Sequence, residues 1–251
     1  MMIHSTTSLL AKNQSSNINS STHRDDKTSS ISLKMNDQVT TEQADISIKA
    51  KQLRKLDALK TAQANTDTAI AFLQSGDSAV ASIQEIVYRI RVLALQSSNG
   101  PLTDNDRQLF QVEVSSLIHE MNRISEHAYS SGVKMLNGDF SRGSRTASLW
   151  FHIGPNMNDR TRAYVGTITS LSLNLATIDG SIIKLSTAGA ANDGVGTVDA
   201  ALHRIRKQRG DLHGYMNSLK EHGKFLEAEI KNLEIRMGDA SGRDQGTYDP
   251  N

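Results

Sequence analysis

The chain has 251 residues, with 28 basic and 27 acidic side chains and a formal net charge of +1. It contains no cysteine, which excludes disulfides, thiol catalysis, zinc–thiolate sites and iron–sulfur clusters. The balanced charge provides no whole-molecule field that would attract nucleic acid or an anionic membrane, and the low content of aromatic residues (4 %) and proline (three) favours helices over a β-sandwich.

Apolar segments of the kind that membranes or secretion signals require are not found. No apolar run approaches the roughly 18 residues of a membrane span, so we expect no membrane insertion. Residues 3–11 contain too few apolar side chains for a cleaved secretory signal. The protein is therefore expected either to stay inside the cell or to leave it without cleavage of a signal.

The composition divides the chain into three parts. Residues 1–45 are rich in Ser, Thr, Asn and Gln and contain no aromatic residue. We predict a polar N-terminal arm there, weakly helical or disordered, because it has little to bury. Residues 46–237 carry helical periodicity and form the predicted central domain. The Gly-rich residues 238–251 are predicted to be a disordered tail.

The first predicted helix continues to about residue 96. Its apolar side chains are spaced by three and four residues, which is the pattern of a coiled-coil seam. Ile83, Val87 and Ile90 belong to this seam. Gly100 and Pro101 are expected to end the helix, because glycine readily takes a left-handed conformation and proline cannot continue a helix.

A second helix is predicted to begin at Thr103. Thr103 and Asp106 have the spacing of a capping box, with Asp in place of the usual Glu or Gln. Val114 and Leu117 lie on the apolar stripe of this helix.

Residues 145–187 change to a period of two, which indicates β-hairpins. Leu149 and Phe151 alternate with Trp150 and His152, and a turn follows at residues 154–156. A second hairpin is predicted around Asp179 and Gly180.

The last predicted helix has the longest seam. Its seam positions are Val198, Leu202, Ile205, Arg209, Leu212, Met216, Leu219, Gly223, Leu226, Ile230, Leu233 and Met237. Arg209 is either a polar residue that sets the register or a tolerated flaw. This seam is roughly 60 Å long, and an apolar stripe that is so long and narrow is buried by other long helices that lie parallel or antiparallel to it. The predicted fold is therefore mainly α, a bundle of long helices with a small β-hairpin region inserted before the last helix.

Residue patterns of the common enzyme classes are missing. We find no phosphate-binding glycine loop, nucleophile elbow or metal-binding histidine pair. We therefore predict no catalytic, metal-binding or cofactor-binding residues, and no enzyme. The arginines between residues 142 and 162 could bind phosphate, but a charged hairpin face is the favoured interpretation.

Three segments resemble one protein family. Residues 88–100, YRIRVLALQSSNG, are similar to the first inner helix of bacterial flagellin. Residues 207–212, KQRGDL, resemble its last inner-core helix. Residues 142–156, RGSRTASLWFHIGPN, resemble the class B core flagellins of spirochaete periplasmic flagella.

This resemblance implies a structural subunit, or minor variant, of the flagellar filament, which supports motility by helical self-assembly. The implied partners are other flagellin subunits, the flagellar export apparatus or a chaperone, and a host innate receptor. The implied location is the flagellum, periplasmic in a spirochaete and otherwise extracellular, reached without a cleaved signal. The candidates for subunit packing or receptor contact are Arg89, Arg91, Leu93, Gln96 and Glu113.

The two ends of the chain depart from the family pattern. The N-terminal arm lacks most apolar steps of the family's amphipathic helix, and residues 238–251 stand where the C-terminal assembly helix is expected. The alternative hypothesis is therefore a non-polymerising flagellin-like binding or decoy protein, or a decaying paralogue.

Overall fold

The computed structural model describes residues 4–145 and 148–243, with side chains from residue 34 to residue 239. Its helices are α1 (His4–Ser97), α2 (Asp104–His127) and α3 (Ala188–Arg243). Its strands are β1 (Tyr129–Ser130), β2 (Val133–Lys134), β3 (Leu149–His152) and β4 (Arg160–Ala163). The predicted fold, mainly α with a β-hairpin region before the last helix, is confirmed.

The chain divides into two compact units, residues 56–236 and residues 1–55 together with 237–251. In the smaller unit, residues 4–55 are helical, and the side chains of residues 34–49 are exposed. Of the two states that the sequence left open for the N-terminal arm, the structure has the helix. Residues 238–243 also continue α3, where the sequence predicted a disordered tail, since each of their two glycines costs a helix only about 1 kcal/mol.

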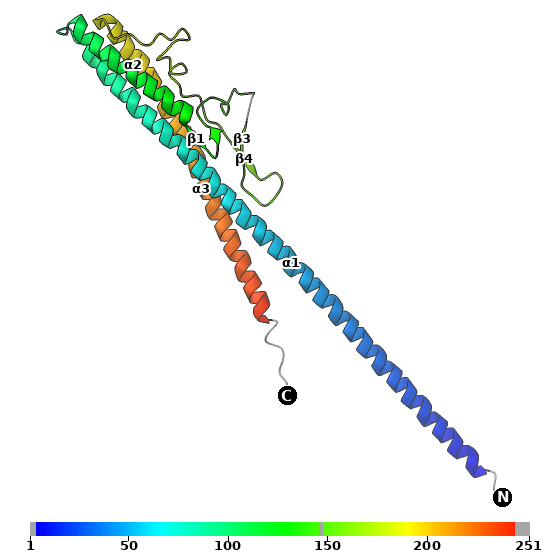
Figure 1. Ribbon diagram of the computed structural model, residues 1–251. Coiled ribbons are helices and arrows are strands. Elements are labelled where there is room, and N and C mark those ends of the chain that lie inside the picture. The colour runs from blue at the N-terminus through cyan, green and yellow to red at the C-terminus, as the bar shows by residue number, and fades with distance from the viewer. Residues whose placement is uncertain (1–3, 146–147, 244–251) are drawn as a thin grey trace. The chain divides into compact units, whose positions relative to one another are not determined.

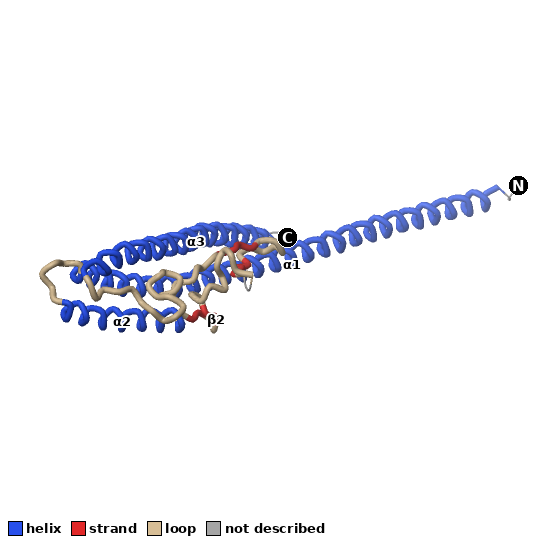
Figure 2. Tube along the Cα trace, turned by 90° about the horizontal axis from the view of Figure 1, so that it is seen from above, coloured by secondary structure: helices blue, strands red, loops and turns tan. Residues whose placement is uncertain are grey.

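The larger unit is built around packed helices. Figures 1 and 2 both show α2 and α3 alongside the C-terminal part of α1. Most predicted seam residues are buried, at most 3 % exposed: Ile83, Val87, Ile90, Val114, Leu202, Ile205, Leu212, Leu219 and Leu226. Leu117 is only partly buried at the edge of the core, and Ile118 takes the buried position beside it because α2 turns by 3.6 residues.

The two predicted exceptions in the α3 seam face α1. Gly223 is buried, and a Cβ atom added there would lie 3.3 Å from Nε2 of Gln63. Glycine at this position therefore permits a close approach of the two helices. Beyond it, Leu59, Ala62 and Leu226 form a small second cluster of buried apolar side chains.

Strands β3 and β4 form the first predicted hairpin. Leu149 pairs with Ala163 and His152 with Arg160 in an antiparallel register. Phe151 points inward and contacts the edge of Phe72 on α1, with the ring centroids 6.0 Å apart. The alternation read from the sequence therefore matches the two faces of this hairpin.

The second predicted hairpin is represented by a short antiparallel pairing outside the named strands. Ala176 and Ile182 form a bridge, the Thr177 N–H donates to the Ser181 carbonyl at 2.8 Å, and the Ile183 N–H donates to the Leu175 carbonyl at 3.1 Å. The Asp179 carboxylate accepts hydrogen bonds from the Thr177 hydroxyl and from the backbone and hydroxyl of Ser181. These local bonds close a tight turn and leave too few residues for strands.

The sequence also missed a short hairpin, β1–β2. Its two-residue turn is Ser131 and Gly132, both with positive φ, as hairpin turns of this length require. Strands of two residues are too short for a period-two pattern to show.

Candidate functional site

The candidate contact residues lie where α1 meets its neighbours. Arg89 of α1 binds Glu113 of α2, with 2.7 Å between Nε and Oε1, and both side chains are about half exposed. Arg91 binds Asp199 of α3 instead, with 2.6 Å between Nε and Oδ1. Two residues along a helix turn the side chain by about 200°, so these arginines necessarily face different neighbours.

The Arg91–Asp199 pair is a charge-assisted contact at the rim of the bundle. The hydrogen bond from Arg91 holds the pKa of the Asp199 carboxyl below its ordinary value. Arg91 thus connects α1 to α3, and the structure does not bring it together with Arg89 and Glu113.

The position of Leu93 differs from the expectation that it is a contact residue. Its side chain is 1 % exposed and lies in the core, so in the single subunit it is not available to a partner or receptor. Its apolar character and its place in the helical period serve packing inside the bundle. Gln96, by contrast, is exposed.

Apolar side chains lie exposed beside the Arg89–Glu113 contact. Val92, one helical turn after Arg89, is 43 % exposed, and Leu109, one turn before Glu113, is 66 % exposed. Val112 is 69 % exposed. We call Arg89, Val92, Leu109, Val112 and Glu113 the α1–α2 face. The heptad pattern does not indicate the three apolar members, because they lie off the seam, where that pattern predicts polar residues.

The turn between α1 and α2 sets the register of this face. Arg107 is 4 % exposed and donates hydrogen bonds to the backbone carbonyls of Ser97, Asn99 and Leu102. Thr103 caps α2, and Asp106 completes the predicted capping box. The sequence predicted the cap but not the role of Arg107.

Arg209 occupies the polar position of the α3 seam. Its guanidinium binds the Asp77 carboxylate of α1 through two contacts, Nε to Oδ1 at 2.9 Å and Nη2 to Oδ2 at 3.1 Å. His213 contacts the same carboxylate at 3.1 Å. Burial alone would raise the pKa of Asp77, but hydrogen bonds from Arg209 and His213 outweigh it and lower that pKa.

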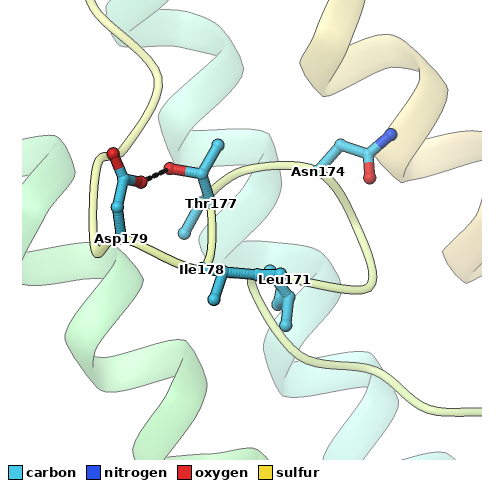
Figure 3. A pocket seen from close by; sticks show the side chains of 6 residues that line it. Leu171, Asn174, Thr177, Ile178 and Asp179 are labelled. Atoms are coloured by element: carbon cyan, nitrogen blue, oxygen red, sulfur yellow. Dashed lines mark hydrogen bonds between the residues drawn. The ribbon is translucent and has the colours of Figure 1, made fainter.

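An open hollow of about 520 Å³ lies beside the Asp179 turn (Figure 3). Its lining includes Leu171 and Ile178, which Figure 3 labels, and Ile178 is 93 % exposed. Asp179 is the only titratable residue of the lining, and its carboxylate is held by the turn. The hollow therefore lacks the converging polar groups that catalysis needs.

The part of the chain that the structure describes holds neither a cluster of metal-binding side chains nor a membrane-spanning helix. There, His, Asp and Glu side chains form no group of three or more that could hold a metal ion. No helix in the same residues is both long and apolar enough to cross a membrane.

Long packed helices with a hairpin region before the last helix define the class of the fold, a mainly α bundle of long helices. The chain belongs to the flagellin family. The family model for the bacterial flagellin N-terminal helical region matches residues 34–141. The chain is 42 % identical over 179 residues to the flagellar filament core protein flaB2 of Brachyspira hyodysenteriae, covering 70 % of this chain and 63 % of that one.

Other relatives are matched over more of their length. The chain is 36 % identical to the flagellar filament 33 kDa core protein of Treponema phagedenis, covering 86 % of this chain and 77 % of that one. It is 39 % identical to flagellin FlaB1 of Treponema pallidum, covering 78 % of this chain and 71 % of that one. The predicted resemblance to spirochaete core flagellins is confirmed.

Solved structures support the fold. A crystal structure of Bacillus cereus flagellin matches with a TM-score of 0.54 at 23 % identity, over 64 % of this chain and 88 % of that one. A putative flagellar hook-associated protein from Vibrio parahaemolyticus matches with a TM-score of 0.61 at 15 % identity, over 76 % of this chain and 95 % of that one.

Proposed function

We propose that this chain is a structural subunit of a flagellar filament and packs against other flagellin subunits through the α1–α2 face. The observation that carries the proposal is the exposure of Val92, Leu109 and Val112 around the Arg89–Glu113 pair. Apolar side chains grouped on a folded surface and rimmed by charge are typical of a protein interface. The relatives, named as filament core proteins, favour this function over a non-polymerising binding or decoy protein.

The bundle suits this role mechanically. Two ion pairs, Arg91–Asp199 and Arg209–Asp77, connect α1 to α3. Arg107 donates hydrogen bonds that stabilise the turn between α1 and α2. The α1–α2 face is therefore carried on rigid helices, so that little conformational freedom is lost when a neighbouring subunit packs on it.

Location and export follow from the same proposal. The relatives are named as flagellar filament core proteins and a flagellin of spirochaetes, which supports a flagellar location, and we propose that this chain lies in a periplasmic flagellum. We propose that it reaches the filament through the flagellar export apparatus, with or without a chaperone, and without a cleaved signal.

Recognition by a host innate receptor is proposed for the unassembled subunit only. Arg89 and Glu113 are about half exposed in the single chain and would be covered if the α1–α2 face packs in the filament. We expect Arg89→Ala to reduce the signal of a receptor reporter cell line treated with the monomer. Equal signals from both proteins would contradict the contact.

Quantitative mass spectrometry of washed, sheared filaments tests the main proposal. We expect peptides from residues 70–237 at a constant ratio to the major flagellin across independent preparations. Their absence from filaments, with the protein present in whole cells, would show a non-assembling relative.

A matched pair of variants tests the α1–α2 face. Leu109→Asp places a charge on this face, and Ile178→Asp places the same charge on an exposed turn of the same unit. We expect Leu109→Asp to be depleted from filaments at least fivefold and Ile178→Asp to be incorporated like the wild type. Equal incorporation of both variants would rule out packing through this face.

A further inference from the structure

The outer face of the β3–β4 hairpin carries an alternating stack of guanidinium groups and aromatic rings. The Arg160 guanidinium carbon lies 4.8 Å from the centroid of the Trp150 ring, and that of Arg162 lies 5.4 Å from it. Arg162 and Arg142 each lie 4.8 Å from the centroid of Tyr164. The order of groups is thus Arg160, Trp150, Arg162, Tyr164 and Arg142, which we call the arginine ladder.

The hairpin register creates this ladder. Trp150 is the cross-strand partner of Arg162, and residues 160 and 162 project from the same face because strand side chains alternate. His152 pairs with Arg160 and extends the same face. Trp150 remains 47 % exposed despite its two arginine neighbours.

The arginines of the ladder, Arg142, Arg160 and Arg162, form no ion pair within the part of the chain that the structure describes. Asp159 adjoins Arg160 in sequence, but its carboxylate closes the hairpin loop by accepting hydrogen bonds from the backbone and side chain of Asn156, at 2.9 and 2.8 Å. Three guanidinium groups therefore share one small surface, and none of them forms an ion pair with a described carboxylate.

The stacking determines which ligand chemistry fits. A guanidinium that stacks on a ring still has its N–H groups in its own plane, where they bind a carboxylate through two parallel hydrogen bonds. The rings of Trp150 and Tyr164 each contact two guanidinium groups, which leaves less ring surface for stacking by nucleic-acid bases or sugars. Arg142 and Arg160 are exposed, whereas Arg162 already donates to the Ser148 hydroxyl.

We propose that the arginine ladder is a docking surface for a carboxylate-rich segment of another protein. The exposed guanidinium groups of Arg142 and Arg160 bind the acidic side chains, and the rings of Trp150 and Tyr164 hold these arginines in place before the partner arrives. The arginine ladder and the α1–α2 face have no residue in common, so binding to the ladder can be measured on the single subunit.

The single tryptophan of the chain provides a direct test with the full-length protein in solution. The probe is a synthetic ten-residue glutamate peptide, and the controls are a ten-residue glutamine peptide and a ten-nucleotide single-stranded DNA. We expect the glutamate peptide to shift Trp150 fluorescence saturably and the glutamine peptide to have no effect. Equal responses to both peptides, or tighter binding of the DNA, would overturn the proposal.

Variants test which arginines bind the peptide. Because substitutions beside Trp150 alter the fluorescence of this tryptophan, binding is measured here by the fluorescence anisotropy of a labelled glutamate peptide. We expect Arg142→Gln with Arg160→Gln to weaken binding about five- to tenfold. The matched control, Lys220→Gln with Arg236→Gln, removes the same charge from α3 and should weaken binding less than about twofold. An equal loss in both double variants would mean that only net charge matters, which would overturn the site.

A third variant tests the guanidinium geometry. Arg160→Lys keeps the charge but removes the planar group that both stacks and binds a carboxylate at two points. We expect weaker binding than the wild type with an unchanged circular dichroism spectrum. Unchanged affinity would contradict the proposed mode of recognition.

Discussion

Arg209 and Asp77 join α3 to α1 through two nearly parallel hydrogen bonds inside a seam that is otherwise apolar. The Asp77 side chain is 15 % exposed and that of Arg209 is 29 % exposed, so the pair is partly shielded from water. Helices with a repetitive apolar seam can slip by one heptad at little cost, whereas this pair forms in one alignment only. Of the two interpretations that the sequence left open for Arg209, the geometry favours a residue that sets the register.

Removing Arg209 should destabilise the subunit. We expect Arg209→Ala to lower the free energy of unfolding by about 1–3 kcal/mol, because Asp77 would lose two hydrogen bonds in a partly buried position. Lys220→Ala, an exposed substitution on the same helix, should change it by less than about 0.5 kcal/mol. Urea denaturation of both variants measures the difference, and similar values would show that the pair contributes little.

The lowered pKa of Asp77 predicts a dependence on pH. The folded chain binds a proton at this carboxyl less readily than the unfolded chain, whose pKa is about 3.9. The resulting stability is complete above that pH and is lost as the pH falls through the folded pKa. We expect the difference in unfolding free energy between wild type and Asp77→Asn to shrink below about pH 4. A difference that stays constant from pH 7 to pH 3 would contradict this.

Two leucine substitutions compare the core with the α1–α2 face. Leu212 is fully buried, and Leu212→Ala should cost about 2–5 kcal/mol because it leaves a cavity. Leu109 is 66 % exposed, and Leu109→Ala should cost less than about 0.5 kcal/mol in the monomer. Thermal and urea unfolding of the monomers test both values. A large cost at Leu109 would mean that it packs within the subunit.

Replacing Arg107 should destabilise the subunit more than replacing Arg123, the other arginine of α2. Its guanidinium donates to carbonyls from both sides of the α1–α2 turn, so Arg107→Ala leaves the buried Ser97 carbonyl and two partly buried carbonyls without this donor and should cost about 2–4 kcal/mol. Arg123, an exposed residue paired with Glu120 on the same helix, is the control and should cost less than about 0.5 kcal/mol. Equal effects would show that the turn does not depend on Arg107.

Thr103 offers a test of the predicted helix cap. Its hydroxyl accepts from the Asp106 backbone N–H, and the Asp106 carboxylate accepts from the Thr103 backbone N–H at 3.0 Å. We expect Thr103→Ala to cost about 1 kcal/mol and Thr103→Ser, which keeps the hydroxyl, to cost much less. Amide hydrogen exchange in the first turn of α2 should rise only in the alanine variant.

Local features of the sequence determined the helices and one hairpin. The three- and four-residue spacing of apolar side chains, the Thr103 cap and the alternation from Leu149 to His152 each act within a few neighbouring residues. Such signals need no knowledge of the partner surface. They also identified the family, because segments such as residues 88–100 retain its pattern of residues.

Only the tertiary structure decided which side chains meet. Sequence placed Leu93 among the contact candidates, but packing against the other helices buries it. It gave no indication that Arg209 reaches Asp77, 132 positions away, or that Trp150 lies between Arg160 and Arg162. These contacts depend on how helices and strands from distant parts of the chain are brought together. Periodicity determines which face of an element is apolar, whereas ion pairs and ring stacks require the distances that only the packed chain provides.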